Sequence, residues 1–282
     1  MRAFLDCVPC LVGQCHRAAR LATDDPELQA EALRAVLRYL QQADLSSSPI
    51  DISLEPHRLV REVTGCPDPY ASLKAQSNAE ALQHYPRLKE VVRSSDDPLL
   101  TAVRIAAAGN IMDFGALASF DVEATLNRAL TAPFGIDHFR EFREALASAR
   151  RVLYLLDNAG EIVFDRILIE ELAGKHVTAA VKSYLFINDA MLDDARAVGI
   201  DQVAEIVAVP PADVSPAPFA GAWEAADVII AKGQANFEAF RDVDGPIFFL
   251  LIIKCPVLAA DAGTRAGDLV LQSRARVASA KG

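Results

Sequence analysis

The chain has 282 residues, a formal net charge of −10 and 52% hydrophobic residues. This length suits one large or two modest domains, and the apolar fraction is enough for a sizeable core. The acidic net charge argues against general nucleic-acid binding and against binding to an anionic membrane surface, since either function needs basic patches on the protein. No apolar run approaches the roughly 18 residues of a membrane-spanning helix. No N-terminal signal peptide is visible, because Asp6 and Cys7 interrupt the first apolar residues, so we expect a cytoplasmic protein.

The N-terminal segment carries three of the five cysteines, packed between Cys7 and Cys15. This spacing is unlike a disulfide framework spread along a chain. Cys7 and Cys10 form a CxxC pair, but no βαβ pattern adjoins them and a zinc site usually needs further ligands. The two thiols therefore have either a structural role in packing or a metal or redox role, and the sequence does not decide between them. Cys255 is far away in sequence but is a candidate neighbour in space.

Residues 1–145 are predicted to form a mainly helical domain. Acidic residues followed by proline mark helix starts at Pro26 and Pro98, because Asp caps a helix and proline fits its first turn. We expect an interruption at Pro86, since proline removes a backbone donor. The helical patterns cover residues 26–40, 55–63, 71–93 with that interruption, 98–109, 120–130 and 136–149.

From residue 146 the pattern changes to strands that alternate with helices. Strands are expected at 152–156, 176–181, 205–209, 225–231 and 247–253, with a further candidate at 269–271. Helices are expected at 162–172 and 191–198. Strands separated by helices imply a parallel sheet covered on both sides. The fold class is therefore α/β: a doubly wound, mostly parallel sheet in residues 146–282 behind the helical domain.

Polar side chains follow three of the predicted strands. Asp157-Asn158 with Glu161, Asn188-Asp189, and Lys232 with Asn236 stand at these strand ends. Each piece alone is commonly an Asx-turn, a helix cap or an ordinary loop. In an open α/β sheet, however, the carboxyl ends of the strands face one ligand-binding crevice. Carboxylate and amide oxygens suit Mg²⁺ or Mn²⁺, and a lysine supplies a positive charge for phosphate, so the set indicates metal-assisted phosphoryl chemistry.

The motifs at these strand ends resemble those of a known family, once catalogued as domain of unknown function 89 and described as metal-dependent damage-control phosphatases. They are D-N-A-G-E followed by Asp165, N-D-A with Asp194, and K-G-Q-A-N. Upstream and downstream pieces extend the resemblance over almost the whole chain: C-V-P-C at 7–10, D-P-Y with Lys74 and Asn78, G-N-I-M-D-F-G at 109–115, and Lys254-Cys255. The cysteine-containing pieces are similar to the prokaryotic branch.

The resemblance implies a divalent metal (Mg, Mn, Co or Ni) and a small phosphorylated metabolite as substrate. The residues matching the metal ligands are Asp157, Asn158 and Asp189. The residues matching the phosphate and substrate contacts are Lys232, Gly233, Asn236, Asn110 and Asp113. The candidate catalytic residues are Asp157, Asp189 and Glu161. Two mechanisms are possible at this point: attack on the phosphate by an activated water, or a phosphoenzyme formed on Asp157. Cys7, Cys10 and Cys255 would be structural thiols or ligands of a second metal.

The sequence thus predicts a metal-dependent phosphatase for small metabolites such as sugar phosphates or phosphopantetheine-like compounds. One alternative is an S-adenosylmethionine-dependent carboxyl methyltransferase, although no Gly-rich loop follows the first predicted strand. Another is a metal or redox module built on Cys7 and Cys10. Residues 183–187 (S-Y-L-F-I) replace the small Gly and Pro residues that the family often has there, and we expect them to narrow the pocket. The oligomeric state stays open.

Overall fold

The structure is a computed structural model, and it describes residues 2–110, 122–209 and 220–274. The predicted site residue Asp113 lies outside the described residues. None of the described helices combines the length and the apolar character needed to cross a membrane.

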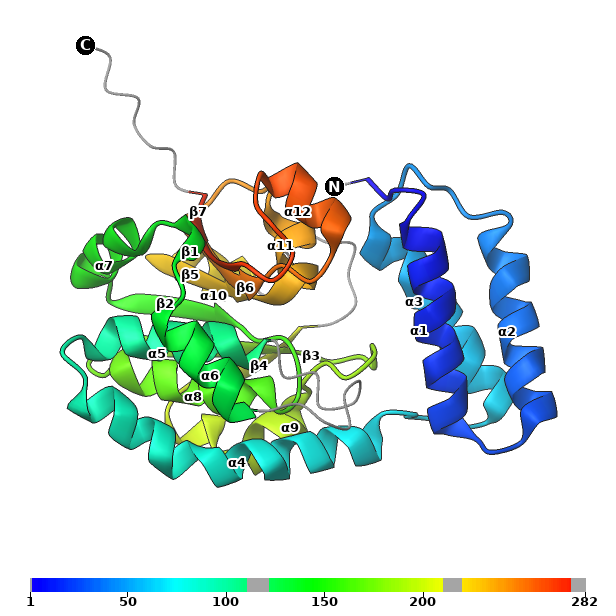
Figure 1. Ribbon diagram of the computed structural model, residues 1–282, viewed down its shortest axis with the longest axis horizontal. Helices are drawn as coiled ribbons and strands as arrows, with labels where there is room; N and C mark the ends of the chain where they lie inside the picture. The colour runs from blue at the N-terminus through cyan, green and yellow to red at the C-terminus, as the bar shows by residue number, and fades with distance from the viewer. Residues whose placement is uncertain (1, 111–121, 210–219, 275–282) are drawn as a thin grey trace, which may run out of the picture.

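The helices lie mainly in the first half of the chain and then alternate with strands (Figure 1). In chain order they are α1 (Cys7–Ala22), α2 (Pro26–Leu40), α3 (Pro49–Thr64), α4 (Ala71–Ser94), α5 (Pro98–Gly109), α6 (Val122–Thr131), α7 (Phe139–Ser148), α8 (Glu161–Glu171), α9 (Leu192–Ala197), the 3₁₀ helix η1 (Ile200–Gln202), α10 (Ala220–Ala225), α11 (Gly233–Phe240) and α12 (Pro256–Ala262).

In the described part of the chain, seven strands form one sheet in the order β1-β7-β6-β5-β2-β3-β4. They are β1 (Phe134–Asp137), β2 (Arg151–Leu155), β3 (His176–Lys182), β4 (Glu205–Val209), β5 (Val228–Lys232), β6 (Ile247–Ile252) and β7 (Leu269–Ser273). All neighbouring pairs are parallel except β6 and β7, which are antiparallel. The mostly parallel sheet is therefore confirmed, with β1 and β7 at one edge running opposite to the other five strands.

Helices cover both faces of this sheet, as predicted. Alternate residues of β2 point to opposite sides: Val152 and Tyr154 join a core with α4, α5 and α8, while Leu153 and Leu155 join a core with α11 and α12. Figure 1 shows these two helical layers on opposite sides of the strands. Because both faces are buried, β6 is apolar along its whole length, and β2 and β5 are apolar except for Arg151 at the start of β2 and Lys232 at the end of β5.

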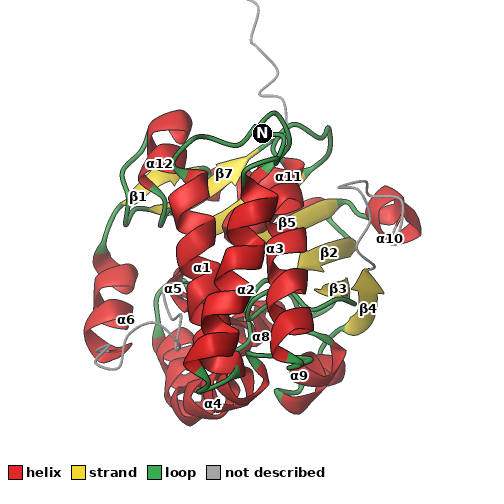
Figure 2. Cartoon of the chain, turned by 90° about the vertical axis from the view of Figure 1, so that its right-hand side faces the viewer, coloured by secondary structure: helices red, strands yellow, loops and turns green. Residues whose placement is uncertain are grey.

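The helices α1, α2 and α3 form a separate bundle that lies beside the sheet in Figure 1 and in front of it in Figure 2. It has its own small core, which includes Cys15, Val36 and Val60. Helices α4, α5 and α7 instead share the core of the sheet. The division at residue 145 stays a prediction, and from this packing we propose a boundary after α3, near Gly65.

Several helix boundaries follow from the local signals. Asp25 and Asp97 accept backbone N–H groups of the first turns of α2 and α5, and proline occupies the first turn of each helix. Helix α3 begins earlier than expected, at Pro49, because the Ser48 side chain caps it. It ends at Gly65, whose φ of 66° is the left-handed conformation that terminates many helices.

Two elements differ from the prediction. Pro86 does not interrupt α4: buried residues on both sides of it, Ala81 and Leu88, pack into the same core, and this packing outweighs the lost backbone hydrogen bond. The segment from residue 136 begins as strand β1, not as helix. It pairs with β7, which is more than 130 residues away, and its partly buried residues alternate with exposed ones.

Candidate active site

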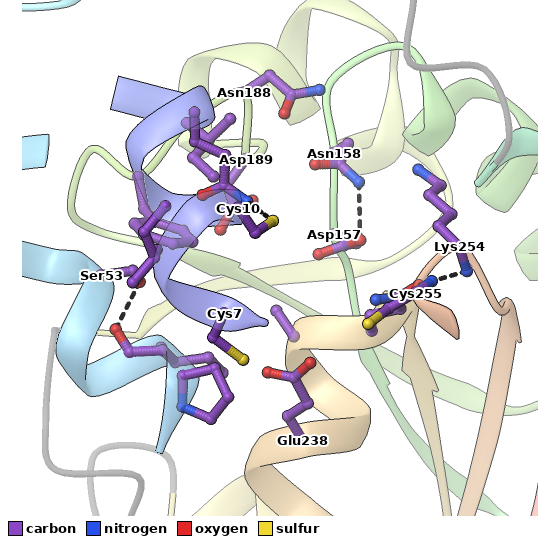
Figure 3. A pocket seen from close by; sticks show the side chains of 18 of the residues that line it. Cys7, Cys10, Ser53, Asp157, Asn158, Asn188, Asp189, Glu238, Lys254 and Cys255 are labelled. Atoms are coloured by element: carbon purple, nitrogen blue, oxygen red, sulfur yellow. Dashed lines mark hydrogen bonds between the residues drawn. The ribbon is translucent and has the colours of Figure 1, made fainter. Parts of the chain in front are cut away.

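A cavity of about 270 Å³ lies between the α1–α3 bundle and the carboxyl ends of the sheet strands (Figure 3). One wall carries Asp157 and Asn158, which follow β2, and Asn188 and Asp189, which follow β3. The opposite wall comes from α1 and α3. The cavity is therefore at the edge of the sheet where the sequence predicts a ligand-binding crevice.

The backbone holds the two acidic strand ends side by side. The Ala159 N–H donates to the Asn188 carbonyl at 2.9 Å, and the Ala190 N–H donates to the Asp157 carbonyl at 2.8 Å. Asn158 and Asp189 accordingly form an antiparallel bridge outside the main sheet. The structure thus brings together the three predicted metal ligands, Asp157, Asn158 and Asp189.

Two side-chain amides connect Asp157 to Glu161. The Asn158 Nδ2 donates to Asp157 Oδ2 at 2.7 Å and to Glu161 Oε2 at 3.1 Å. The Asn110 Nδ2 donates to the same two oxygens at 3.3 and 2.9 Å, and its Oδ1 accepts the N–H of Ile252. Burial, and then the nearby Glu161 charge, raise the pKa of Asp157 to about 6. Asn110 lines the cavity as predicted, whereas Glu161 lies just behind it, almost fully buried.

Lys232 lies beneath this layer and has no exposed surface. Its ammonium donates to Glu161 Oε1 at 2.8 Å, to Asp165 Oδ1 at 2.5 Å and to the Ala106 carbonyl at 2.8 Å. These three acceptors use all three N–H groups of the lysine. Burial opposes ionisation of Glu161, but the Lys232 charge outweighs it and lowers the pKa of that carboxyl. The predicted contact of Lys232 with phosphate finds no support in this arrangement.

Gly233 and Asn236 are not among the residues that line the cavity, and their contact with substrate stays a prediction. Gly233 has a φ of 79°, and a Cβ there would lie 1.9 Å from Asp157 Oδ2. The Asn236 Nδ2 donates to the carbonyls of Lys232 and Leu156 at 2.7 and 3.3 Å. Gly233 leaves room for the Asp157 carboxylate, which any larger residue would block. Asn236 holds the backbone on both sides of the site through its two hydrogen bonds.

A family model that describes the damage-control phosphatase ARMT1-like domain matches residues 3–270. The chain belongs to this family. A damage-control phosphatase of Archaeoglobus fulgidus is 37% identical over 280 residues, covering 94% of this chain and 96% of the relative. A damage-control phosphatase of Pyrococcus horikoshii is 30% identical, covering 96% and 97%. The crystal structure of a DUF89 family protein from P. horikoshii superimposes with a TM-score of 0.86 at 28% identity, covering 97% of this chain and 99% of that one.

The comparisons confirm the family resemblance predicted from the strand-end motifs, and they support a phosphatase over the methyltransferase alternative. They do not assign roles to individual residues. The roles in this member of the damage-control phosphatase family therefore rest on its own geometry.

Two lysines at strand ends belong to the site although the sequence analysis gave them no role. Lys182, the last residue of β3, forms an ion pair with Asp189. Lys254 follows β6, lines the cavity and is exposed, and it forms no ion pair with any described residue. Their position directly after buried strands is the signal that predicted Asp157 and Asp189, and it applied equally to these lysines.

The three thiols of the predicted cysteine set all line the cavity, so Cys255 does lie near Cys7 and Cys10 (Figure 3). All are free thiols, and burial raises the pKa of Cys7 and Cys10. Glu238 of α11 points toward Cys7, and burial raises the pKa of this carboxyl to about 7. The metal or structural role of the thiols stays a prediction.

The charges and donors of the site fit a hard cation. Its four carboxylates, Asp157, Glu161, Asp165 and Asp189, outnumber its three ammonium groups, Lys182, Lys232 and Lys254, by one formal negative charge. Within the described residues, no group of three or more His, Cys, Asp or Glu side chains has metal-binding spacing. A site here would hence use two carboxylates and the amide of Asn158, with water or phosphate completing the shell, as Mg²⁺ tolerates.

Proposed function

We propose that this chain is a metal-dependent phosphatase that hydrolyses phosphoric monoesters of small metabolites. The observation that carries the proposal is the pairing of Asp157 and Asn158 with Asp189 in a cavity of a damage-control phosphatase family member. A cavity of about 270 Å³ suits a small phosphorylated molecule. The net charge of −10 fits such a substrate better than nucleic acid, and we propose that the enzyme acts in the cytoplasm.

A divalent cation is proposed to bind Asp157, Asn158 and Asp189, where it would neutralise phosphoryl oxygens and position the ester. Mg²⁺, Mn²⁺, Co²⁺ and Ni²⁺ are the candidates. The Asn158 amide nitrogen faces Asp157 and Glu161, so its oxygen is on the side turned away from both carboxylates (Figure 3). This amide is thus oriented to present an acceptor to a cation.

Lys254 is proposed as the positive group that binds the phosphate, in place of Lys232. It lies on the cavity wall and its ammonium has no ion-pair partner among the described residues. Its backbone is fixed, because the N–H groups of Lys254 and Cys255 donate to Gln234 Oε1 at 2.5 and 3.2 Å. A lysine in this position supplies charge to the substrate at little cost in desolvation.

Water is proposed as the attacking group, with Asp157 or Asp189 accepting its proton. Both carboxylates reach the cavity. Glu161 is assigned a different role from the predicted base. Its Oε1 accepts from Lys232 and its Oε2 accepts from Asn110 and Asn158, so it orients the two amides and has no free side toward a water.

The test is hydrolysis of p-nitrophenyl phosphate by the purified chain with each of the four metals and with EDTA. We expect turnover that requires metal and that falls about 100-fold or more in Asp157→Asn, at least the loss seen when metal sites lose a supporting group. Asp201→Asn, an exposed acidic residue outside the site, is the control and should keep full activity. Turnover that persists in EDTA, or in Asp157→Asn, would contradict the proposal.

A further inference from the structure

The turn that carries Asp189 into the cavity has a strained backbone. Ile187 has a φ of 47°, and no other non-glycine residue in the described ranges has a positive φ. The Asp189 N–H donates to the Phe186 carbonyl at 3.0 Å, so Ile187 is the first central residue of a β-turn. Turns with positive φ at this position favour Gly, Asn or Asp, and a β-branched residue is a genuine outlier there. Contacts outside the turn must therefore stabilise this conformation.

Those contacts come from the α1–α3 bundle. The Ile187 side chain packs against the bundle core. Phe186 lies edge-on against the His57 ring of α3, with ring centroids 5.4 Å apart. The Arg61 guanidinium, also from α3, donates to the Leu185 carbonyl at 3.3 Å. Three consecutive residues of the loop are hence fixed to a helical unit that has a core separate from that of the sheet.

The other end of the same turn is fixed to the strand ends that carry Asp157 and Lys182. Asn188 accepts the Ala159 N–H, the Ala190 N–H donates to Asp157, and the Asp189 carboxylate pairs with Lys182. The turn therefore connects the bundle on one side with the Asp157 strand end on the other, and only Ile187 and Asn188 separate the anchored Phe186 from Asp189.

We propose that Ile187 is a positioning residue: packing of its partly buried side chain against the bundle core holds the left-handed turn that sets Asp189 against Asp157. The α1–α3 bundle thereby determines the geometry of the active site as well as forming one wall of the cavity. This role rests on the proposed phosphatase function of Asp157 and Asp189. It explains why a bulky apolar residue occupies a turn position that glycine would fill without strain.

The experiment compares Ile187→Gly with Ile187→Val and with Val63→Ala. Glycine keeps the backbone conformation accessible but removes the anchor, whereas valine keeps a β-branched anchor. Val63 packs against the same bundle core on α3 and is outside the turn, so its variant controls for a general loss of bundle packing. Metal-dependent turnover and backbone hydrogen exchange are measured on all three.

We expect the amides of Ala159 and Ala190 to exchange roughly 10-fold faster or more in Ile187→Gly, because the bridge between the two strand ends opens locally. We expect kcat to fall about 10-fold or more with KM changed less than about 3-fold, since Asp189 is misplaced rather than removed. Ile187→Val and Val63→Ala should stay within about 3-fold of wild type in both measurements.

If Ile187→Gly has the same amide exchange rates and the same kcat as wild type, the proposal is overturned. It is also overturned if Val63→Ala loses as much kcat as Ile187→Gly does. Wild-type exchange at Ala159 and Ala190 combined with lowered kcat would also overturn it, since the turn would not have moved. A wild-type enzyme without metal-dependent turnover would refute the phosphatase function, while the exchange rates would still decide whether Ile187 holds the turn.

Discussion

Replacing Lys232 with methionine tests whether this lysine is a structural cation or a phosphate ligand. Lys232→Met keeps an unbranched apolar stem of similar length but removes three hydrogen bonds, to Glu161, Asp165 and the Ala106 carbonyl. The two carboxylates have 1% and 0% exposure, so water cannot replace the lost ammonium. We therefore expect the variant to lose stability as well as activity.

The magnitude follows from breaking a buried ion pair on one side only. Removing one partner and leaving its counter-charges buried typically costs about 3–5 kcal/mol. Protonation of the stranded carboxyls limits the cost: burial already raises the pKa of Asp165 to about 7 in the presence of Lys232. We expect a loss of about 3–5 kcal/mol in the free energy of unfolding, or roughly 10 °C in melting temperature for a chain of this size.

Urea unfolding followed by circular dichroism measures this loss, with Lys254→Met as the matched control. Lys254 is exposed on the cavity wall, so its variant should change the unfolding free energy by less than about 0.5 kcal/mol while raising KM. If Lys232→Met unfolds like the wild type but binds substrate weakly, the structural role of Lys232 is refuted. The predicted contact between Lys232 and the phosphate would then be supported.

Two further predictions concern Asp157 and the bundle. Gly233→Ala places a Cβ 1.9 Å from Asp157 Oδ2 at a φ of 79°; we expect turnover to fall about 100-fold, whereas Gly221→Ala, which meets nothing within 4 Å, should match wild type. Burial, and then the Arg61 charge, lower the pKa of His57 from 6.5 to about 4. A depressed folded-state pKa stabilises the fold above the unfolded-state value, so this contribution is complete at pH 7 and is lost as the pH falls from 6.5 to 4. Between pH 7 and pH 4, the unfolding free energy of wild type should fall by about 3 kcal/mol more than that of His57→Phe. Urea unfolding at both pH values measures this difference. The same pH dependence in the two proteins would contradict a buried neutral imidazole at His57.

The strand-end residues were predictable because each strand of a parallel sheet has the same recognisable apolar pattern and the same direction. Apolar runs such as 152–156 and 247–253 identify strands buried on both faces, and parallel strands place their carboxyl ends at one edge. That rule brings Asp157 and Asp189 to one edge although they are 32 residues apart in sequence, and in the structure Asn158, next to Asp157, forms a bridge with Asp189. The residue types at these strand ends indicated a hard metal and a phosphate, and the family resemblance added the damage-control phosphatases, which no spacing in the chain reveals.

The position of Lys232 was not predictable from the strand-end rule, since a lysine after a buried strand can face the crevice or the core. A signal for the core was present in α8. Glu161 and Asp165 are four residues apart, so they lie on one face of α8, and both are buried among its apolar residues. Two carboxylates on a buried helical face require a buried cation, and Lys232 meets both.

Strand β1 and the turn at Ile187 depend on partners that local sequence does not reveal. The four residues of β1 form a strand because β7 provides hydrogen-bond partners and burial at the sheet edge. Ile187 adopts a conformation that its own preferences oppose, because its side chain packs against the core of the α1–α3 bundle. In both cases tertiary contacts override the local propensity, and at Ile187 the override coincides with the candidate active site.

Lys232 also determines, without touching the cavity, which atom Asn158 presents to it. The Lys232 charge keeps Glu161 ionised, and an ionised carboxylate only accepts hydrogen bonds. Glu161 Oε2 therefore selects the amide nitrogen of Asn158, and the planar amide must turn its oxygen the other way. With a protonated Glu161 one of the two carboxylate acceptors of this nitrogen is lost, and only Asp157 Oδ2 still orients the amide. A residue expected to bind phosphate thus helps to orient Asn158, a proposed metal ligand, through one buried carboxylate, so the loss of activity in Lys232→Met should appear first as weaker metal binding.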